Sequence, residues 1–272
     1  MRRPFPAPVT SVSAATYRGR VTGAVPDPPP GWLAAGRRLT VLTGAGVSTD
    51  SGIPDYRGPN GVWTRDPDAE KLVTLSYYVA DPAIRARAWR MRADVRAATV
   101  APNAGHRALA DLERQGRLRA LLTQNVDGLH QAAGSSPDRV LELHGTVHAV
   151  ECLSCGDRTS MDAALARVDA GEDDPACLVC GGILKSATVS FGQALDEAVL
   201  AAAADAAADC DVFLAVGTSL VVYPVAGLVE VAAAHGARVV IVNAEPTPYD
   251  GLADLVVREP ISTALPRLLG TG

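Results

Sequence analysis

The chain is 272 residues long, 48% of its residues are hydrophobic, and its formal net charge is −5. This length and this hydrophobic content are enough for a globular protein with a sizeable core. A net negative charge gives no global reason to bind nucleic acid or an anionic membrane, and no apolar run approaches the roughly 20 residues that span a bilayer. We therefore expect a cytoplasmic protein with neither nucleic acid nor a membrane as a partner.

The first residues, MRRPFPAPV, lack the continuous apolar stretch of a secretory signal peptide. A mitochondrial presequence is the alternative interpretation of the two arginines, but the Pro-rich run that follows fits an amphipathic helix poorly. Residues 1–31 contain the run PDPPP and are predicted to form a flexible or polyproline extension. Folded structure is expected to begin near Trp32.

A strand is predicted at residues 39–43 (LTVLT), followed by the glycine-rich segment GAGVSTDSGIPDYRG. Residues 44–46 (GAG) would let the backbone approach a pyrophosphate, with free N–H groups at the start of the following helix. The third glycine of the dinucleotide fingerprint is missing, so a plain tight turn explains this motif alone nearly as well. Asp55 and Arg57 favour the nucleotide site, because they are charged residues in a loop and an arginine fork pairs with phosphate.

Residues 66–100 are rich in arginine and aromatic side chains and have a helical composition, so we expect an inserted helical segment. A second helix should follow, with Asn103 as its N-cap and Gly116 as its stop. His106 lies on that helix, and we interpret it as a packed or capping histidine.

Residues 118–145 read LRALLTQNVDGLHQAAGSSPDRVLELHG and predict a strand, a polar elbow and a second strand that ends on His144. The length of the first apolar run and the turn-prone NVDG after it favour a buried parallel strand. Open α/β sheets bind ligands at the carboxyl ends of their strands, where the polar cluster would lie: Gln124, Asn125 and Asp127.

Two CxxC pairs follow, formed by Cys152, Cys155, Cys177 and Cys180. Such a pair of knuckles indicates a tetrathiolate zinc site; disulfides are the competing interpretation, which a reducing cytoplasm disfavours. Four thiolates close the tetrahedral shell and leave no position for substrate, so the zinc should be structural and should hold a small ribbon together. Cys210 is interpreted as a small buried residue.

After the ribbon, strands and helices alternate again. Strands are predicted in SATVSFG, DVFLAVG and RVVIVN, and helices in residues 196–208, in YPVAGLVEVAAAHG and in a terminal segment ending near Leu269. This alternation indicates an α/β protein with a doubly wound parallel sheet. Two loops at strand ends could accept ribose or phosphate, although ordinary loop chemistry explains either one alone; they contain Gly217, Thr218 and Ser219, and Asn243 and Glu245.

The motifs GAGVSTDSGIPDYRG, TQNVDGLHQAAG, ELHG, the four cysteines, VSFG, GTSLVVYP and VNAEP occur in the order seen in sirtuins, and the chain resembles this family from about Leu39 to Leu269. The resemblance implies a Rossmann-type domain and a smaller domain with an active cleft between them. The Rossmann-type domain would comprise residues 32–65, 101–147 and 187–272, and the small domain the helical insertion (66–100) and the zinc ribbon (148–186).

The resemblance also implies which residues bind NAD and the acyl-lysine protein substrate. Those implied for NAD are Gly44, Ala45, Gly46, Ser48, Asp55, Tyr56, Arg57, Gln124, Asn125, Val126, Asp127, His144, Gly217, Thr218, Ser219, Asn243, Ala244, Glu245 and Ile261. Those implied for the substrate are Val189, Phe191, Gly192, Trp89 and Arg92. Metabolic enzymes are the expected substrate proteins.

The reaction that the resemblance implies is NAD-dependent deacylation of lysine, with Asn125 and His144 as catalytic residues. In this chemistry the acyl oxygen attacks the anomeric carbon as nicotinamide leaves, giving an alkylimidate, and His144 acts as general base on the ribose hydroxyls. The products are free lysine, nicotinamide and an O-acyl-ADP-ribose. A core histidine at a strand end is the competing interpretation of His144.

Two other classes of function are considered. A mono-ADP-ribosyltransferase would use the same cofactor site, whereas a non-catalytic binding module would keep the cysteines but need neither His144 nor Asn125.

The acyl preference stays open. Relatives that prefer succinyl or malonyl lysine carry a tyrosine and an arginine three residues apart, and the best alignment places Trp89 and Arg92 there, without the phenol. The chain also departs from the family's usual phenylalanine, proline and glutamate at Tyr56, Ser186 and Gln193.

Overall fold

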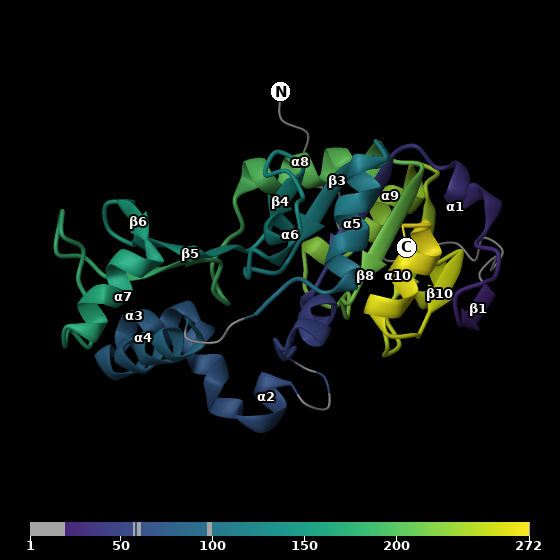
Figure 1. The fold of residues 1–272 in the computed structure, drawn as a ribbon. Coiled ribbons are helices and arrows are strands. Elements are labelled where there is room, and N and C mark those ends of the chain that lie inside the picture. Colours follow the sequence, from purple (N-terminus) through teal and green to yellow (C-terminus); the bar gives the residue numbers. More distant parts are fainter. Residues whose placement is uncertain (1–19, 57, 59–60, 97–99, 272) are drawn as a thin grey trace.

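A computed structural model describes residues 20–56, 58, 61–96 and 100–271 of the chain (Figure 1). Within these residues, seven parallel strands form one sheet in the order β1-β10-β9-β8-β2-β3-β4. The strands are β1 (Arg20–Gly23), β2 (Leu39–Thr43), β3 (Leu118–Thr123), β4 (Val140–Glu142), β8 (Val212–Val216), β9 (Arg238–Val242) and β10 (Leu255–Val257).

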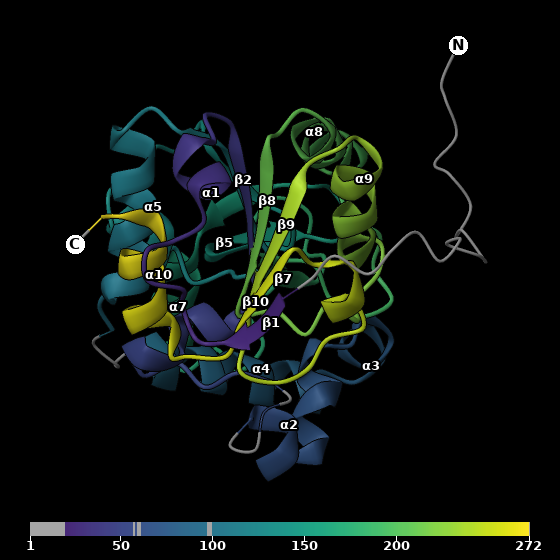
Figure 2. The same ribbon diagram turned by 90° about the vertical axis from the view of Figure 1, so that its right-hand side faces the viewer.

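Helices cover both faces of this sheet (Figure 2). One face packs against α1 (Gly31–Ala35), α5 (Ala104–Arg114) and α10 (Ile261–Leu269), and the other packs against α8 (Glu197–Ala208) and α9 (Leu228–Ala234). Neighbouring strand residues alternate between the two cores. In β2, for example, Val41 belongs to the first core and Leu42 to the second. Burial on both faces explains why the central strands are continuous apolar runs in the sequence.

A second, antiparallel sheet has the order β6-β5-β7 and lies away from the large sheet (Figure 1). Its strands are β5 (Gly145–Cys152), β6 (Arg158–Ser160) and β7 (Leu184–Thr188). The helices α4 (Pro82–Arg96) and α7 (Met161–Asp169) pack against it, and Trp89 of α4 is fully buried in their common core. The helical insertion and the cysteine-bearing ribbon therefore share one hydrophobic core. The α/β class with a Rossmann-type sheet and a smaller second part is confirmed.

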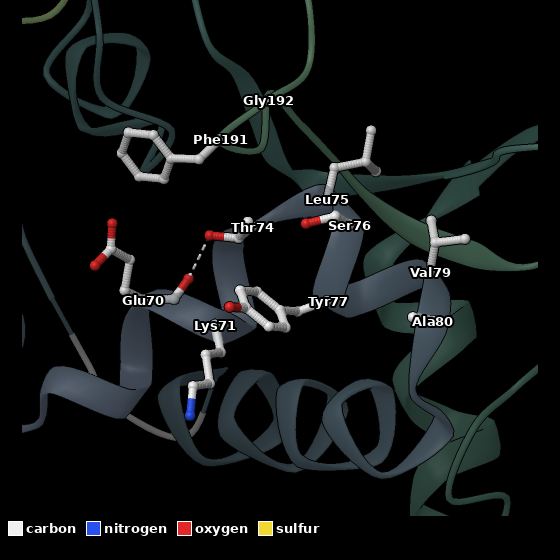
Figure 3. A pocket seen from close by; sticks show the side chains of 10 residues that line it. All are labelled: Glu70, Lys71, Thr74, Leu75, Ser76, Tyr77, Val79, Ala80, Phe191 and Gly192. Atoms are coloured by element: carbon white, nitrogen blue, oxygen red, sulfur yellow. Dashed lines mark hydrogen bonds between the residues drawn. The ribbon is translucent and has the colours of Figure 1, made fainter.

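Short helices connect these parts. They are η1 (Ala45–Ser51), α2 (Val62–Arg65), η2 (Pro67–Val73), α3 (Leu75–Ala80), α6 (Leu129–Ala132), η3 (Val225–Gly227) and η4 (Asp250–Leu252). An open groove of about 720 Å³ lies on the outer side of η2 and α3, next to Phe191 (Figure 3). No helix among the residues described is long and apolar enough to cross a membrane.

The structure corrects the expected start of the folded chain. Residues 20–23 form β1, which pairs with β10, and Val25 is 5% exposed within the hydrophobic core. The Val25 N–H donates to the Glu259 carboxylate at 2.8 Å. The prediction of an extension up to residue 31 is therefore wrong for residues 20–31, because the sheet edge supplies partners that a Pro-rich sequence does not reveal. Residues 1–19 lie outside the part that is described.

Two further strand predictions need correction. The segment SATVSFG was predicted to continue the large sheet, but its first residues belong to β7, which pairs antiparallel with β5 in the small sheet. The strand expected to end on His144 ends at Glu142. An apolar run of a few residues does not specify which sheet it joins, and this explains both differences.

Candidate active site

The carboxyl ends of β2, β3 and β8 meet at one edge of the large sheet, and three glycines allow the loops after β2 and β8 to pack closely there. A Cβ at Gly44 would lie 2.7 Å from the Gly217 carbonyl oxygen, and a Cβ at Gly46 would lie 2.7 Å from the Gly217 Cα. Gly217 has φ +60°, and its own Cβ would lie 2.4 Å from the Val47 nitrogen. The Gly44, Gly46 and Val47 N–H groups all donate to protein carbonyls.

Glycine is therefore required in this turn for a different reason from the expected one. They were expected to give a pyrophosphate access to free N–H groups, but here they let the β2 turn contact the β8 loop directly. The helix that follows is the short 3₁₀ helix η1. Its Ser48 side chain, 1% exposed, points to the polar cluster after β3.

Ser48 is the centre of a hydrogen-bonded cluster. Its hydroxyl donates to the Asp127 carboxylate at 2.7 Å and accepts from the Asn125 side-chain amide at 3.1 Å. The structure thus brings together three residues that the sequence places 77 and 79 positions apart. A hydroxyl, a carboxamide and a carboxylate at strand ends are the groups that can bind ribose hydroxyls and a nicotinamide carboxamide.

Two buried histidines support this cluster from behind. The Asn103 N–H donates to His106 Nδ1 at 3.3 Å, so the neutral ring carries its proton on Nε2, which lies 3.4 Å from the Ser48 hydroxyl. The His130 ring centroid lies 4.9 Å from that of His106, and its Nε2 lies 2.9 Å from the Thr43 hydroxyl. His106 is confirmed as a packed and capping residue. Sequence reasoning missed His130, because a lone histidine after a polar turn gives no signal of its contacts.

His144 is held in one tautomer by the backbone. Its Nδ1 lies 3.1 Å from the Gln124 carbonyl oxygen, and a carbonyl can only accept, so Nδ1 carries the proton. Nε2 is then the unprotonated nitrogen, as a general base requires. Burial lowers the pKa of His144 below 6.5, against a smaller opposing effect of the Gln124 hydrogen bond, so the ring is neutral at physiological pH.

The remaining predicted cofactor residues lie on neighbouring loops. The Gln124 side-chain amide donates to the Thr218 hydroxyl at 2.9 Å and so joins the β3 and β8 loops. After β9, the Asn243 amide donates to the Glu245 carbonyl at 2.8 Å. Arg258, which the sequence did not single out, donates to the carbonyls of both Asn243 and Glu245. Arg258 therefore fixes the shape of this loop.

The predicted substrate segment begins directly beside His144. The Val189 N–H donates to the His144 carbonyl at 2.8 Å, so the catalytic candidate and the substrate segment are linked through one backbone bond. The turn that follows is closed by Gln193, whose side chain accepts from the Ser190 N–H at 3.1 Å. Gly192 in this turn has φ +81°, which favours glycine.

Arg92 contributes a cation beside this segment. Its Nη2 donates to the Ser186 hydroxyl at 3.0 Å, and its Cζ lies 5.6 Å from the Trp89 ring centroid. Nη1 is buried and has no hydrogen-bond partner among the residues that the structure describes. Burial raises the pKa of Tyr56, and the Asp127 charge adds to this effect while the Arg92 charge opposes it.

Several predicted residues have placements that limit their roles. Trp89 is 0% exposed and packs in the core of the small part, which contradicts a direct contact between its side chain and substrate. Ile261 is 9% exposed at the start of α10 and its side chain packs in the hydrophobic core, which leaves little of it accessible to a cofactor. Asp55 accepts the Gly58 N–H at 2.8 Å and so stabilises its own turn. Arg57 lies outside the described residues.

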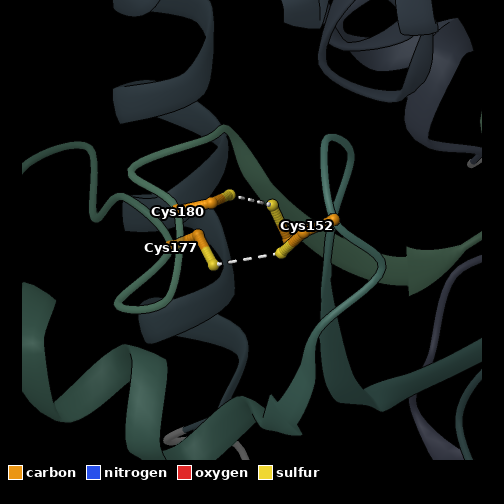
Figure 4. A group of neighbouring side chains, drawn as sticks. Cys152, Cys177 and Cys180 are labelled. Carbon is orange, nitrogen blue, oxygen red and sulfur yellow. Dashed lines mark hydrogen bonds between the residues drawn. The ribbon is translucent and has the colours of Figure 1, made fainter.

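The four cysteines converge in the ribbon, with one sulfur atom from each all within 4.8 Å of one another. Figure 4 shows Cys177 and Cys180 on one loop facing Cys152 on the other. The Sγ atoms of Cys152 and Cys180 are 3.5 Å apart, and those of Cys155 and Cys177 are 3.7 Å apart. Zn–S bonds of about 2.3 Å in a tetrahedron require S···S distances of about 3.8 Å. The cluster therefore fits a structural zinc.

The fold and the site together define a Rossmann-type nucleotide-binding protein with a polar cluster at the strand ends and a ribbon whose four cysteines fit a structural metal. The family model of the Sir2 family matches residues 44–224. The chain therefore belongs to the Sir2 family, the sirtuins.

Known relatives are similar over most of their length. The NAD-dependent protein deacetylase 2 of Streptomyces coelicolor is 64% identical over 231 residues, which cover 85% of this chain and 96% of the relative. A solved Sir2 homologue in complex with NAD has a TM-score of 0.76 at 35% identity, covering 88% of this chain and 90% of that one. A Sir2 bound to a deacetylated p53 peptide and 3′-O-acetyl ADP-ribose has a TM-score of 0.79 at 32% identity, covering 89% and 96%.

Proposed function

We propose that this chain, an NAD-dependent protein-lysine deacylase, uses His144 as its general base and releases nicotinamide and O-acyl-ADP-ribose. One observation carries the assignment: the Gln124 carbonyl fixes the proton of His144 on Nδ1 and leaves Nε2 able to accept a proton. The lowered pKa keeps that nitrogen unprotonated at neutral pH. The backbone bond from Val189 to His144 supports the proposal, because it joins the expected substrate segment to the residue that carries the base.

The residues present fit NAD as the cosubstrate. Asn125, Asp127 and Ser48 would hold the nicotinamide-side ribose and the carboxamide, and the loops after β8 and β9 would line the rest of the cofactor. When bound, NAD supplies the anomeric carbon that accepts the acyl oxygen. Ser48 orients the other two side chains through the hydrogen bonds described above, and His106 and Thr43 close the network on its buried side.

The test is mass spectrometry of the protein incubated with NAD and acyl-lysine peptides, with His144→Tyr as the variant. We expect deacylated peptide and O-acyl-ADP-ribose from the unchanged protein. Turnover should fall at least about 100-fold in the variant, because a general base contributes about that factor or more. Consumption of NAD without deacylated peptide, with label from NAD on a protein acceptor, would instead favour an ADP-ribosyltransferase and contradict the proposal.

A second candidate is the removal of acyl groups that end in a carboxylate, such as succinyl. The orphaned, buried Nη1 of Arg92 favours it, because a buried guanidinium nitrogen without a partner is stabilised by an incoming carboxylate. We expect Arg92→Met to lower turnover of succinyl-lysine relative to acetyl-lysine about tenfold or more. Arg90→Met is the matched control, since Arg90 lies on the same helix, is 64% exposed and pairs with Asp173. An unchanged ratio of the two rates in Arg92→Met would eliminate this candidate.

The class of substrate protein and the cellular compartment are also proposed. Substrates are acyl-lysine proteins, with metabolic enzymes as the proposed class, and neither nucleic acid nor a membrane is proposed as a partner. The cytoplasm is the proposed location, because a reducing compartment keeps four zinc-binding cysteines as thiolates.

A further inference from the structure

We propose that the groove on η2 and α3 is an extension of the substrate site and binds an apolar side chain of the substrate protein near its acyl-lysine. This inference rests on the proposed deacylase function and concerns which proteins that site accepts.

The groove is lined by apolar side chains together with several polar ones. Its volume of about 720 Å³ falls in the range of ligand-binding clefts. Figure 3 shows Phe191 on one side, Leu75 and Val79 on the other, and Tyr77 and Thr74 between them, and the lining also includes the polar residues Glu70, Lys71 and Ser76. Such a lining suits an aliphatic or aromatic side chain.

Three of these apolar side chains are exposed to solvent, so contacts within the chain do not bury them. Tyr77 is 51% exposed, Val79 is 45% exposed and Phe191 is 39% exposed, and all three line the same groove. Tyr78, between the first two, is 1% exposed and donates to the Leu184 carbonyl, so the helix is anchored on its inner side only. Exposed apolar residues gathered at one place indicate a binding surface.

The groove is continuous with the predicted substrate segment, and this identifies its occupant. The Phe191 N–H donates to the Val73 carbonyl at 2.8 Å, and the Leu75 N–H donates to the Phe191 carbonyl at 3.0 Å. Phe191 is thus fixed to the groove wall through both of its backbone groups. A peptide bound along the expected substrate segment at Val189 would pass this wall, so the residues beside its acyl-lysine would be the part of the substrate nearest to the groove.

The charges along the groove fit an uncharged occupant. Lys71 lies 2.8 Å from the Asp68 carboxylate, and its sequence neighbour Glu70 is exposed. Among the described residues that line the groove, Lys71 is the only cation and it is paired, so a carboxylate there would meet the Glu70 charge without an unpaired cation. The proposed occupant is therefore an apolar residue of the substrate, with leucine or phenylalanine as the probes.

The experiment measures kcat and KM for acetyl-lysine peptides in which serine is replaced by leucine or phenylalanine at one flanking position at a time. A blocked single acetyl-lysine, too short to reach the groove, is the reference substrate. The proteins are the unchanged chain, Tyr77→Ser and Val79→Ser, and the matched control is Leu178→Ser, which alters an apolar residue 84% exposed on the zinc ribbon and outside the groove.

We expect one flanking position at which leucine or phenylalanine lowers KM about tenfold relative to serine, as burial of an apolar side chain predicts. Tyr77→Ser and Val79→Ser should lose this preference, with the reference substrate unaffected, and Leu178→Ser should keep it. A preference absent from the unchanged protein, or equal in all four proteins, would overturn the proposal. So would a dimer in sedimentation that Tyr77→Ser dissociates, because a second copy would then occupy the groove.

The reference substrate separates this proposal from the one on which it depends. If the unchanged protein fails to deacylate the blocked acetyl-lysine and every peptide, the deacylase function fails. If it deacylates all of them without a side-chain preference, only the groove proposal fails.

Discussion

His130 has no proposed part in the reaction, but its buried ring makes the stability of the folded site depend on pH. Thr43 donates its hydroxyl proton to Thr123 at 2.9 Å, so the proton between Thr43 and His130 must come from His130 Nε2. The Nδ1 nitrogen is then a bare acceptor, and it has no partner among the described residues. The ring is neutral, and burial lowers its pKa to about 3, with the nearby His106 adding to the effect.

This leads to a prediction on pH and stability. In the unfolded chain His130 titrates at its ordinary pKa of 6.5, whereas in the folded chain it resists protonation until about pH 3. Below pH 6.5 the unfolded state binds more protons, so stability falls as the pH falls, by about 2 kcal/mol at pH 5 from this residue alone. His130→Asn should reduce the loss of unfolding free energy between about pH 7.5 and about pH 5, as measured by urea denaturation. An equal loss in both proteins would show that His130 does not titrate in this way.

At the residue scale, the sequence motifs located the polar cluster but not the contacts that explain it. Gln124, Asn125 and Asp127 were expected at a strand end, and the structure places them there. The hydrogen bonds of Asn125 and Asp127 to Ser48 could not be predicted, because they depend on a distant turn that the β8 loop holds in place. The prediction that Trp89 contacts the substrate failed, because an alignment with a binding residue does not show which side of a helix packs into a core.

At the scale of elements, the zinc ribbon supports more than itself. Cys152 and Cys177 are members of the same hydrophobic cluster as Trp89, Met161 and Leu184, so the metal ligands and the helical insertion share one core. A core of this size has little stability of its own, and structural zinc supplies folding free energy directly. The ribbon also continues through β7 into the predicted substrate segment.

We therefore predict that removal of zinc unfolds the small part and exposes Trp89. Chelation should shift tryptophan fluorescence to longer wavelength and abolish deacylation, and added zinc should restore both. In Trp89→Phe the fluorescence shift should be largely lost while the loss of activity remains. Metal release, measured with a colorimetric dye, without any change in fluorescence would contradict a shared core.

At the scale of the whole molecule, alternation of strands and helices predicted the class of fold but not the membership of each strand. The central strands were located because burial on both faces makes them continuous apolar runs. The edge strand β1 was missed because its pairing with β10 joins segments more than 230 residues apart. The strand β7 was assigned to the wrong sheet, because the sequence of five residues does not specify whether the partner strand is parallel or antiparallel.

The position of His144 in the chain gives it a mechanical role as well. The Leu143 N–H is bonded to Thr123 in the large sheet, whereas Gly145 pairs with Thr188 in the small sheet. His144 is therefore the residue at which the chain passes from one sheet to the other, and the start of β5 stays bonded to the large part, since the Val147 N–H donates to the Val126 carbonyl at 3.0 Å. The backbone on both sides of the base is thus fixed by hydrogen bonds. A displacement of the small part against the large sheet would have to break bonds directly beside the base, so the two parts together hold His144 in position.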